Sequence, residues 1–225
     1  MSPRHRSALV VLGFLAGATL WTSPVGALPP AAGHADRTLN RVVTLDAPLP
    51  VRIDLRYGDV RIESGSPGRV EAELRIRCRH DSKRCAENLE EIDLEADSDG
   101  DRLRLQVVGL PRFSNHGTEI ELVVLVPPGF AVDADVGAGR IEVLDVDDDL
   151  RVDLGAGEIR VRMPEEAVRS VEARAGVGEA RLERGGVTQA GRRHLVGGQV
   201  EWESGPGQAS VDLHVGAGEV AVRLE

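Results

Sequence analysis

Three groups of residues in this sequence have types and spacings that could carry chemistry. A small-residue turn, Gly-Ala-Gly, separates two alternating apolar/polar runs in VDLGAGEIRVRM at 152–163 and recurs in VDLHVGAGEVAVRL at 211–224. Cys78 and Cys85 lie seven positions apart, and four aspartates fall within residues 145–149. A Gly-rich turn can hold a phosphate, a cysteine pair can form a disulfide or bind a metal, and clustered carboxylates can bind a cation.

The Gly-rich turns lack the other features of a phosphate-binding loop. A dinucleotide fingerprint requires a third glycine and the start of a helix. Here an alternating, strand-like run follows every turn, and the third glycine is absent after Gly137, Gly155 and Gly216. We therefore interpret the turn glycines as corners between strands. They recur 18 to 21 residues apart in five units: Gly137 and Gly139, Gly155 and Gly157, Gly176 and Gly178, Gly197 and Gly198, and Gly216 and Gly218.

The apolar side of the chain changes at each corner. Val152 and Leu154 occupy even positions before the turn, whereas Ile159 and Val161 occupy odd positions after it. A straight strand would then expose its second half, so the strand must bend, which glycine permits because it has no Cβ. Stacking such units would align the corners and bury one apolar column. The sequence predicts an all-β fold, a β-solenoid-like or β-helix-like stack of ~20-residue repeats preceded by a β-rich region.

Composition predicts the remaining organisation of the chain. Residues 1–27 have the basic start, apolar middle and small-residue end of a signal peptide, and residues 28–39 form a Pro/Ala-rich, flexible leader. Residues 40–225 are expected to form a single domain, β-rich over 40–127 and repetitive over 128–225. The sequence has no second apolar stretch long enough to span a membrane. We expect an exported protein, periplasmic or extracellular, without a membrane span.

Export bears on the interpretation of the two cysteines. Two cysteines this close in an exported chain indicate a disulfide between Cys78 and Cys85. A zinc site would need more ligands at a recognised spacing than His80 supplies between them. Free thiols are the third possibility.

The aspartate cluster offers carboxylate oxygens, the ligands that hard cations such as Ca²⁺ prefer. Asp145, Asp147 and Asp149 are the candidate ligands. The structural alternative, which the setting between two repeats favours, is a polar turn that joins one repeat to the next. No cofactor is predicted.

Charge and composition argue against several classes of function. The formal net charge is −10 at pH 7, and removing the signal peptide would take away two arginines and no acids, so nucleic acid is not expected as a partner. The sequence contains neither G-x-S-x-G nor H-E-x-x-H. Aromatic residues, which stack on sugars in polysaccharide-active enzymes, make up only 3% of the chain. We therefore predict that the protein is not an enzyme.

Residues 119–163, EIELVVLVPPGFAVDADVGAGRIEVLDVDDDLRVDLGAGEIRVRM, consist of a strand ending in Val-Pro and repeated units of strand, small-small-Gly and strand. With CAENLEEIDLEADSDGDRLRLQVVG upstream, the chain resembles the bacterial putative-adhesin domain of unknown function, a family related to the head-GIN adhesin-like domains. The similarity covers residues 40–225, with Gly-Glu-Ile, Gly-Arg-Ile or Gly-Glu-Val where the family usually has Gly-Asp-Ile. The resemblance implies an exported β-solenoid of the cell envelope and supplies no catalytic residues.

The predicted function is that of a non-catalytic, exported β-repeat protein of the cell envelope, an adhesin-like structural or interaction module. Its partner would be a protein or another cell-surface or envelope component, bound by the flat charged ladders that the polar faces of stacked repeats form. The last repeat, ending at Leu224-Glu225, is expected to leave a strand edge free for self-association. The alternative is a ligand- or metal-binding accessory of envelope-stress signalling, with residues 145–149 as its site.

Overall fold

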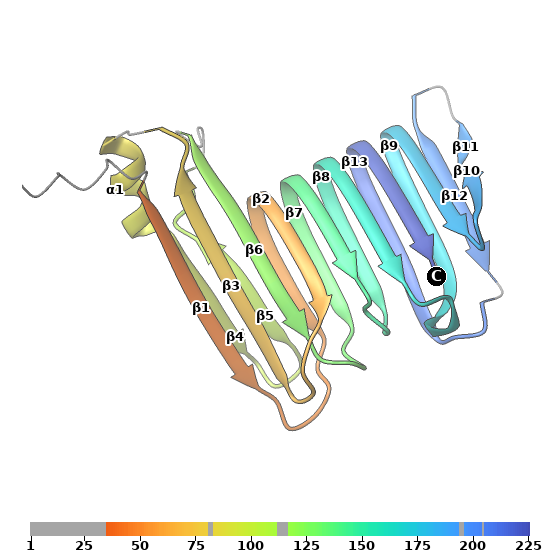
Figure 1. The fold of residues 1–225 in the computed structure, drawn as a ribbon, viewed down its shortest axis with the longest axis horizontal. Coiled ribbons are helices and arrows are strands. Elements are labelled where there is room, and N and C mark those ends of the chain that lie inside the picture. Colours follow the sequence, from red (N-terminus) through yellow and green to blue (C-terminus); the bar gives the residue numbers. More distant parts are fainter. Residues whose placement is uncertain (1–34, 81–82, 112–116, 194–195, 204) are drawn as a thin grey trace, which may run out of the picture. The chain divides into compact units, whose positions relative to one another are not determined.

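The computed structural model describes residues 35–80, 83–111, 117–193, 196–203 and 205–225, which belong to one compact unit. The predicted signal peptide and residues 28–34 of the predicted leader lie outside the described residues. Within them the predicted all-β class is confirmed, since one α-helix and one short 3-10 turn (Glu165–Ala167) accompany the strands (Figure 1). The elements are β1 (Asp36–Thr44), β2 (Val51–Ser64), β3 (Arg69–Cys78), α1 (Lys83–Glu91), β4 (Asp93–Ser98), β5 (Leu103–Val108), β6 (Thr118–Val126), β7 (Val132–Leu144), β8 (Leu150–Met163), β9 (Val168–Arg184), β10 (Val187–Ala190), β11 (Arg192–Arg193), β12 (Gly198–Glu203) and β13 (Ala209–Leu224).

The chain enters the sheet earlier than the sequence predicted. Residues 36–39, which were expected in the flexible leader, form the start of β1. They are ordered because β1 pairs in antiparallel register with β3 along its whole length, and because Leu39 and Val43 pack against the core. The leader prediction is therefore wrong for these four residues.

Helix α1 connects β3 to β4 and is held at both ends. Its buried residues are Cys85 and Leu89. At its carboxyl end, Arg37 of β1 donates from Nη1 to the carbonyl oxygens of Leu89 and Ile92, at 2.7 and 2.8 Å. The last carbonyl groups of a helix have no partner within the helix and carry partial negative charge, so a guanidinium group stabilises them.

The strands form one sheet in the order β1-β3-β6-β2-β7-β8-β13-β9-β12-β11, in which β10 also pairs with β9, and β4 reaches β2 through β5. The long strands β2, β7, β8, β13 and β9 lie side by side in parallel register, and each bends over near its middle (Figure 1). We call the half before the bend the N-arm and the half after it the C-arm. On β2 the N-arm also pairs with β5 and the C-arm with β6, so the two arms belong to two layers.

The apolar core lies between these two layers. In β8 the buried residues include Val152 and Leu154 on the N-arm and Ile159 and Val161 on the C-arm, each at most 3% exposed. Residues that face outwards alternate with them on both arms. The change of apolar side in the sequence thus corresponds to a bend that turns both arms towards one interior.

At the bends, neighbouring strands approach backbone to backbone. The φ angles of Gly139, Gly157 and Gly218 are 143°, 138° and 145°, values that side chains other than glycine rarely adopt. A Cβ on Gly157 would lie 1.8 Å from the carbonyl oxygen of Gly139, and one on Gly218 would lie 1.7 Å from that of Gly157. The same contact continues to Gly58 in β2 and to Gly178 in β9. These positions require glycine both for the backbone conformation and for the close approach of the strands.

The row of bent, paired strands does not coincide with the predicted repeat region 128–225. It begins upstream, because β2 pairs with β7 residue by residue on both sides of its own turn, Tyr57-Gly58-Asp59. It also excludes the unit at Gly197 and Gly198, where β12 runs antiparallel to the N-arm of β9. The expected division between a β-rich part and a repeat part is therefore not a boundary in the sheet.

The free edge expected at the last repeat is wrong. β13 lies between β8 and β9 and pairs with both in parallel register, so the last strand of this sequence is internal to the sheet (Figure 1). Its glycines match those of both neighbours, and Leu213 and Val220, on its two arms, are at most 1% exposed. An internal position pairs its backbone groups on both sides, whereas an edge position would leave one side unpaired.

The strands at the ends of the sheet have features that discourage pairing with another chain. β10 and β11 are only four and two residues long. β1 is longer, but Arg37 reaches the end of α1, and Arg41 forms an ion pair of 3.0 Å with Asp93 of β4. Short edge strands and charged side chains on an edge are known ways to prevent edge-to-edge association. In the described part of the chain, we find no helix with the length and apolar character needed to cross a bilayer.

Candidate interaction face

The outward side chains of the N-arms form rows across the sheet. The strands are parallel and in register, so residues at the same offset from the bend lie side by side, about 4.8 Å apart. Asp135, Asp153 and His214 each stand two positions before the first glycine of their turn, and they are neighbours in the register. Asp133 and Arg151, two positions earlier, are neighbours in the next row.

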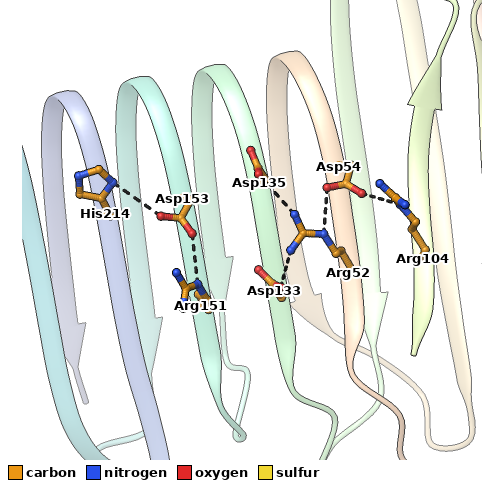
Figure 2. A network of polar contacts seen from close by, with 8 residues as sticks. All are labelled: Arg52, Asp54, Arg104, Asp133, Asp135, Arg151, Asp153 and His214. Carbon is orange, nitrogen blue, oxygen red and sulfur yellow. Dashed lines mark hydrogen bonds and ion pairs between the residues drawn. The ribbon is translucent and has the colours of Figure 1, made fainter. Parts of the chain in front are cut away.

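Figure 2 shows the network that these side chains form, and Arg52 of β2 is its centre. Arg52 donates from Nη1 to Asp133 Oδ2 at 2.6 Å and from Nε to Asp54 Oδ1 at 3.1 Å, and its Nη2 reaches Asp135 Oδ2 at 3.4 Å. Arg104 of β5 donates from Nε to the other oxygen of Asp54 at 2.7 Å. One guanidinium group thus joins β2 to β7, and one carboxylate joins β2 to β5.

The side chains on β8 and β13 form a second, separate group of contacts. Arg151 Nε donates to Asp153 Oδ2 at 3.2 Å, and Asp153 Oδ1 lies 3.6 Å from His214 Nδ1 (Figure 2). Next to His214 in the register stands Arg174 of β9. We define the charged face as the eight residues of Figure 2: Arg52, Asp54, Arg104, Asp133, Asp135, Arg151, Asp153 and His214.

The charged face is most buried around Asp54, whose side chain is 15% exposed, and Arg52, at 27%. The side chains of Arg104 and Arg151 are more than half exposed. Burial of Arg52 acts to lower its pKa, but the carboxylates of Asp133 and Asp54 outweigh this effect, so the pKa of Arg52 is raised. Arg52 is therefore a permanent cation at the centre of the face.

The charged face can recognise a partner through several fixed charges at once. Exposed ion pairs each contribute only about 0–1 kcal/mol to stability. The positions of these side chains are therefore fixed by the in-register backbone pairing of the strands and not by the ion pairs. Charges held at regular intervals discriminate between partners by electrostatic complementarity and accelerate their encounter. This property is typical of a recognition surface.

The predicted disulfide is present and lies away from the charged face. It joins Cys78, at the end of β3, to Cys85 in α1, with an S–S distance of 2.02 Å and a Cα–Cα distance of 6.0 Å. Both residues are buried. The bond fixes the start of α1 against the sheet, which is a structural role.

The aspartates of residues 145–149 accept hydrogen bonds from the chain around them. Asp147 Oδ1 accepts from the amide of Gly129 at 2.9 Å, and Asp149 Oδ1 accepts from the amide of Ser210 at 2.7 Å. Asp145 pairs with Arg162 at 3.3 Å. Across the described residues, His, Cys, Asp and Glu side chains form no group of three that could hold a metal ion. These aspartates connect β7 to β8 and tie that turn to β13.

Sequence reasoning anticipated charged ladders but not the residues that form this one. A usable indication was present, since VRID, VDAD, LRVD and VDLH occupy the same place before their bends. These four segments did not reveal which of their charged residues would pair with each other. Arg52 and Asp133 are 81 positions apart, and His214 meets Asp153 only because β13 lies out of sequence order.

No protein-family model matches the chain, and no curated protein matches it. Among solved structures, it is similar to a putative cell adhesion protein from Clostridium sporogenes, with a TM-score of 0.51 and 13% identity over 85% of this chain and all of the other. Two putative adhesins match at lower similarity. That from Bacteroides fragilis has a TM-score of 0.26 and 9% identity over 83% of this chain and 97% of the other. The one from Parabacteroides distasonis has a TM-score of 0.27 and 8% identity over 84% of this chain and 97% of the other.

These comparisons concern the fold alone. The Clostridium sporogenes structure has the same overall arrangement over its whole length, at an identity too low to carry over residues or partners. The other two are too dissimilar to support an argument. The chain therefore has an adhesin-like fold.

Proposed function

We propose that this chain is a non-catalytic, exported interaction module of the bacterial cell envelope that binds a protein or another surface component through its charged face. The observation that carries the proposal is the in-register pairing of the N-arms with each other and with β5, which holds eight charged or titratable side chains in two rows. A surface of this kind can form many contacts with an extended partner, and each single contact is weak.

The proposed architecture is a solenoid-like stack. β7 bends at its glycines, and residues 145–149 return the chain so that Leu150 of β8 pairs with Val132 of β7. The chain advances by one strand position in 18 residues, which in this proposal is the length of one coil. β13 and β9 continue the same geometry out of sequence order. Stacked coils of this type create long flat faces that serve as binding surfaces in repeat proteins.

Two further observations support the proposal. The disulfide between Cys78 and Cys85 suits an oxidising compartment outside the cytoplasm. The fold is shared with a protein that is named for cell adhesion. Whether the chain works in the periplasm or at the cell surface, the charged face is the part that would meet the partner.

The test is a binding titration of the protein from Leu28 onwards against isolated envelopes of the bacterium that encodes it. We expect saturable binding, about tenfold weaker for the double variant Asp133→Asn/Asp135→Asn, because the charged face loses two of its four carboxylates and Arg52 keeps only Asp54 as a partner. The matched control is Glu119→Gln/Glu121→Gln on β6, which removes two charges from the other layer. Equal weakening by both variants, or the absence of saturable binding, would contradict the proposal. Turnover of envelope polysaccharide by the protein would contradict its non-catalytic part.

A further inference from the structure

The C-arms carry a different feature, a groove of about 360 Å³ on their outward side. It extends over β8, β13 and β9 and is separate from the charged face on the N-arms. Its charged lining consists of four arginines and two glutamates: Arg160, Arg162, Arg181, Arg223, Glu142 and Glu183. Each of the four arginines also forms an ion pair: Arg160 with Glu158, Arg162 with Asp145, Arg181 with Glu219 and Arg223 with Glu183.

The groove exists because one position in a row of long side chains is alanine. Ala221 of β13 stands between Arg160 of β8 and Arg181 of β9 in the parallel register. The methyl group of Ala221 fills little of the space between the two arginines. A hollow floored by small side chains and walled by guanidinium groups is the result.

At one end of the groove, two arginines are direct neighbours. Arg162 and Arg223 are paired positions in the register of β8 and β13, and like charges side by side destabilise a sheet. Arg52 and Arg104 on the charged face are also paired positions, but Asp54 binds both of them.

The neighbours Arg162 and Arg223 lack such a bridge. Arg162 pairs with Asp145, whereas Arg223 pairs with Glu183 and Glu225. Among the described residues, no carboxylate is within ion-pair distance of both guanidinium groups. An anion placed between Arg162 and Arg223 would remove this repulsion.

Arg162 also has an unused donor. Its Nη2 reaches Asp145 at 3.3 Å, while its Nε is buried and makes no hydrogen bond within the described structure. A buried donor without an acceptor costs stability. The Nε and Nη donors of one guanidinium group form the fork that binds two oxygens of a phosphate or sulfate.

We propose that this groove binds a tetrahedral oxyanion, a sulfate or phosphate group, between Arg162 and Arg223. Arg160, which is paired with Glu158, and Arg181, which is paired with Glu219, stand on either side of Ala221, and Thr188 also lines the groove. The groove is open, so the group can be free in solution or carried on a larger molecule such as a sulfated or phosphorylated glycan. This site does not depend on the charged face, and either can fail without the other.

The test uses the intact protein and the ¹⁵N–¹H resonances of the arginine Nε groups in NMR spectra. Sodium sulfate and sodium phosphate are titrated separately against sodium chloride of equal ionic strength. We expect the Arg162 Nε resonance to shift in a saturable way, with a dissociation constant on the order of 1–10 mM. Arg69, on β3 and paired with the carboxylate of Glu71, is the internal control and should not saturate. Equal, non-saturating shifts at Arg162 and Arg69 would overturn the proposal.

Two variants and a third titration complete the experiment. Arg162→Gln should weaken binding at least about tenfold, whereas Arg69→Gln should leave it unchanged. If Arg162→Gln fails to fold, Ala221→Gln, which fills the groove without changing its charge, should abolish the saturable shift. Unchanged affinity in the folded variant would overturn the proposal. The third titration uses a sulfated polysaccharide. If it binds about tenfold more tightly than sulfate, the natural ligand is a group carried on a larger molecule, and if its affinity equals that of sulfate, the natural ligand is the free ion.

Discussion

At the scale of single residues, the bends depend on glycines that contact the neighbouring backbone. Gly157 combines a φ of 138° with a carbonyl oxygen, that of Gly139, only 1.8 Å from where a Cβ would be. Gly129 also has a positive φ, 75°, but no atom lies within 4 Å of its Cβ position. Alanine substitutions at Gly157 and Gly129 therefore separate two costs in stability, that of the backbone conformation and that of the close approach of the strands.

We expect Gly157→Ala to lower the free energy of unfolding by about 2–4 kcal/mol, because the strands must separate to admit the methyl group. Gly129→Ala should cost about 1 kcal/mol, the strain of its conformation alone. Urea unfolding monitored by Trp202, the only tryptophan after the predicted signal peptide, measures both. Equal costs for the two variants would show that the strands do not meet at Gly157.

Tyr57, the only tyrosine, stands at the bend of β2, where the other bent strands have alanine or valine. Its hydroxyl oxygen is buried and lacks a hydrogen-bond partner in the described structure. Burial raises the pKa of Tyr57, and the charge of Arg56 opposes this only in part.

The raised pKa of Tyr57 predicts how stability changes in alkali. The folded protein favours the neutral phenol, so this contribution to stability is fully present below the ordinary tyrosine pKa of about 10 and is lost as the pH rises through the folded-state pKa. Absorbance at 295 nm should show a midpoint above that of free tyrosine. Tyr57→Phe should leave stability at pH 7 within about 1 kcal/mol and reduce the alkaline loss. A midpoint at or below that of free tyrosine would contradict the burial of the hydroxyl.

At the scale of elements, α1 is the part that depends on a covalent bond. It has nine residues, too few for an isolated helix to be stable, and it buries only Cys85 and Leu89. The disulfide and the contact of Arg37 with its last carbonyl groups hold it in place. The β strands on which the charged face lies have no covalent link of this kind in the described structure.

We expect the double variant Cys78→Ala/Cys85→Ala to lose about 2–3 kcal/mol of unfolding free energy, the effect of opening so short a loop. Hydrogen exchange should accelerate in residues 83–91 and remain slow in β7 and β8, because local stability is not shared evenly across a structure. The unchanged exchange of β7 and β8 is the internal control. Uniform acceleration across the chain would show that the disulfide supports the whole sheet.

At the scale of the whole molecule, the last strand of the sequence completes the middle of the sheet. β8 and β9 are connected by residues 164–167 but pair with β13 and not with each other. β13 is therefore a partner of both strands. β8 and β9 cannot complete their backbone pairing until residues 209–225 have joined the sheet. Non-local pairing of this type raises the entropic cost of folding.

We expect removal of residues 209–225 to abolish cooperative unfolding, because β8 and β9 would each face solvent with unpaired backbone groups. Circular dichroism should show a loss of β signal greater than 17 residues can explain. In the intact protein, the amides of β13 should exchange as slowly as those of β8 and more slowly than those of β10. A truncated chain with a native spectrum and an unchanged unfolding midpoint would contradict the internal position of β13.

Much of the local structure could be predicted from the sequence. Alternation with period two identifies strands because side chains on a strand point to opposite faces, and the switch of phase at Gly155 and Gly157 identifies a bend because both arms must bury their apolar side. The disulfide between Cys78 and Cys85 follows from an equally local pattern, two cysteines seven positions apart.

Only the tertiary structure decided which strands are neighbours. The sequence by itself determined an all-β chain of bent strands with one disulfide, because these properties depend on residues close to each other. It did not determine that β2 pairs with β7 or that β13 lies between β8 and β9. Several bent strands carry nearly identical turns, so many orders of stacking satisfy the local pattern equally well. Packing over the whole sheet selects one order, and that order creates both the charged face around Arg52 and the groove at Ala221.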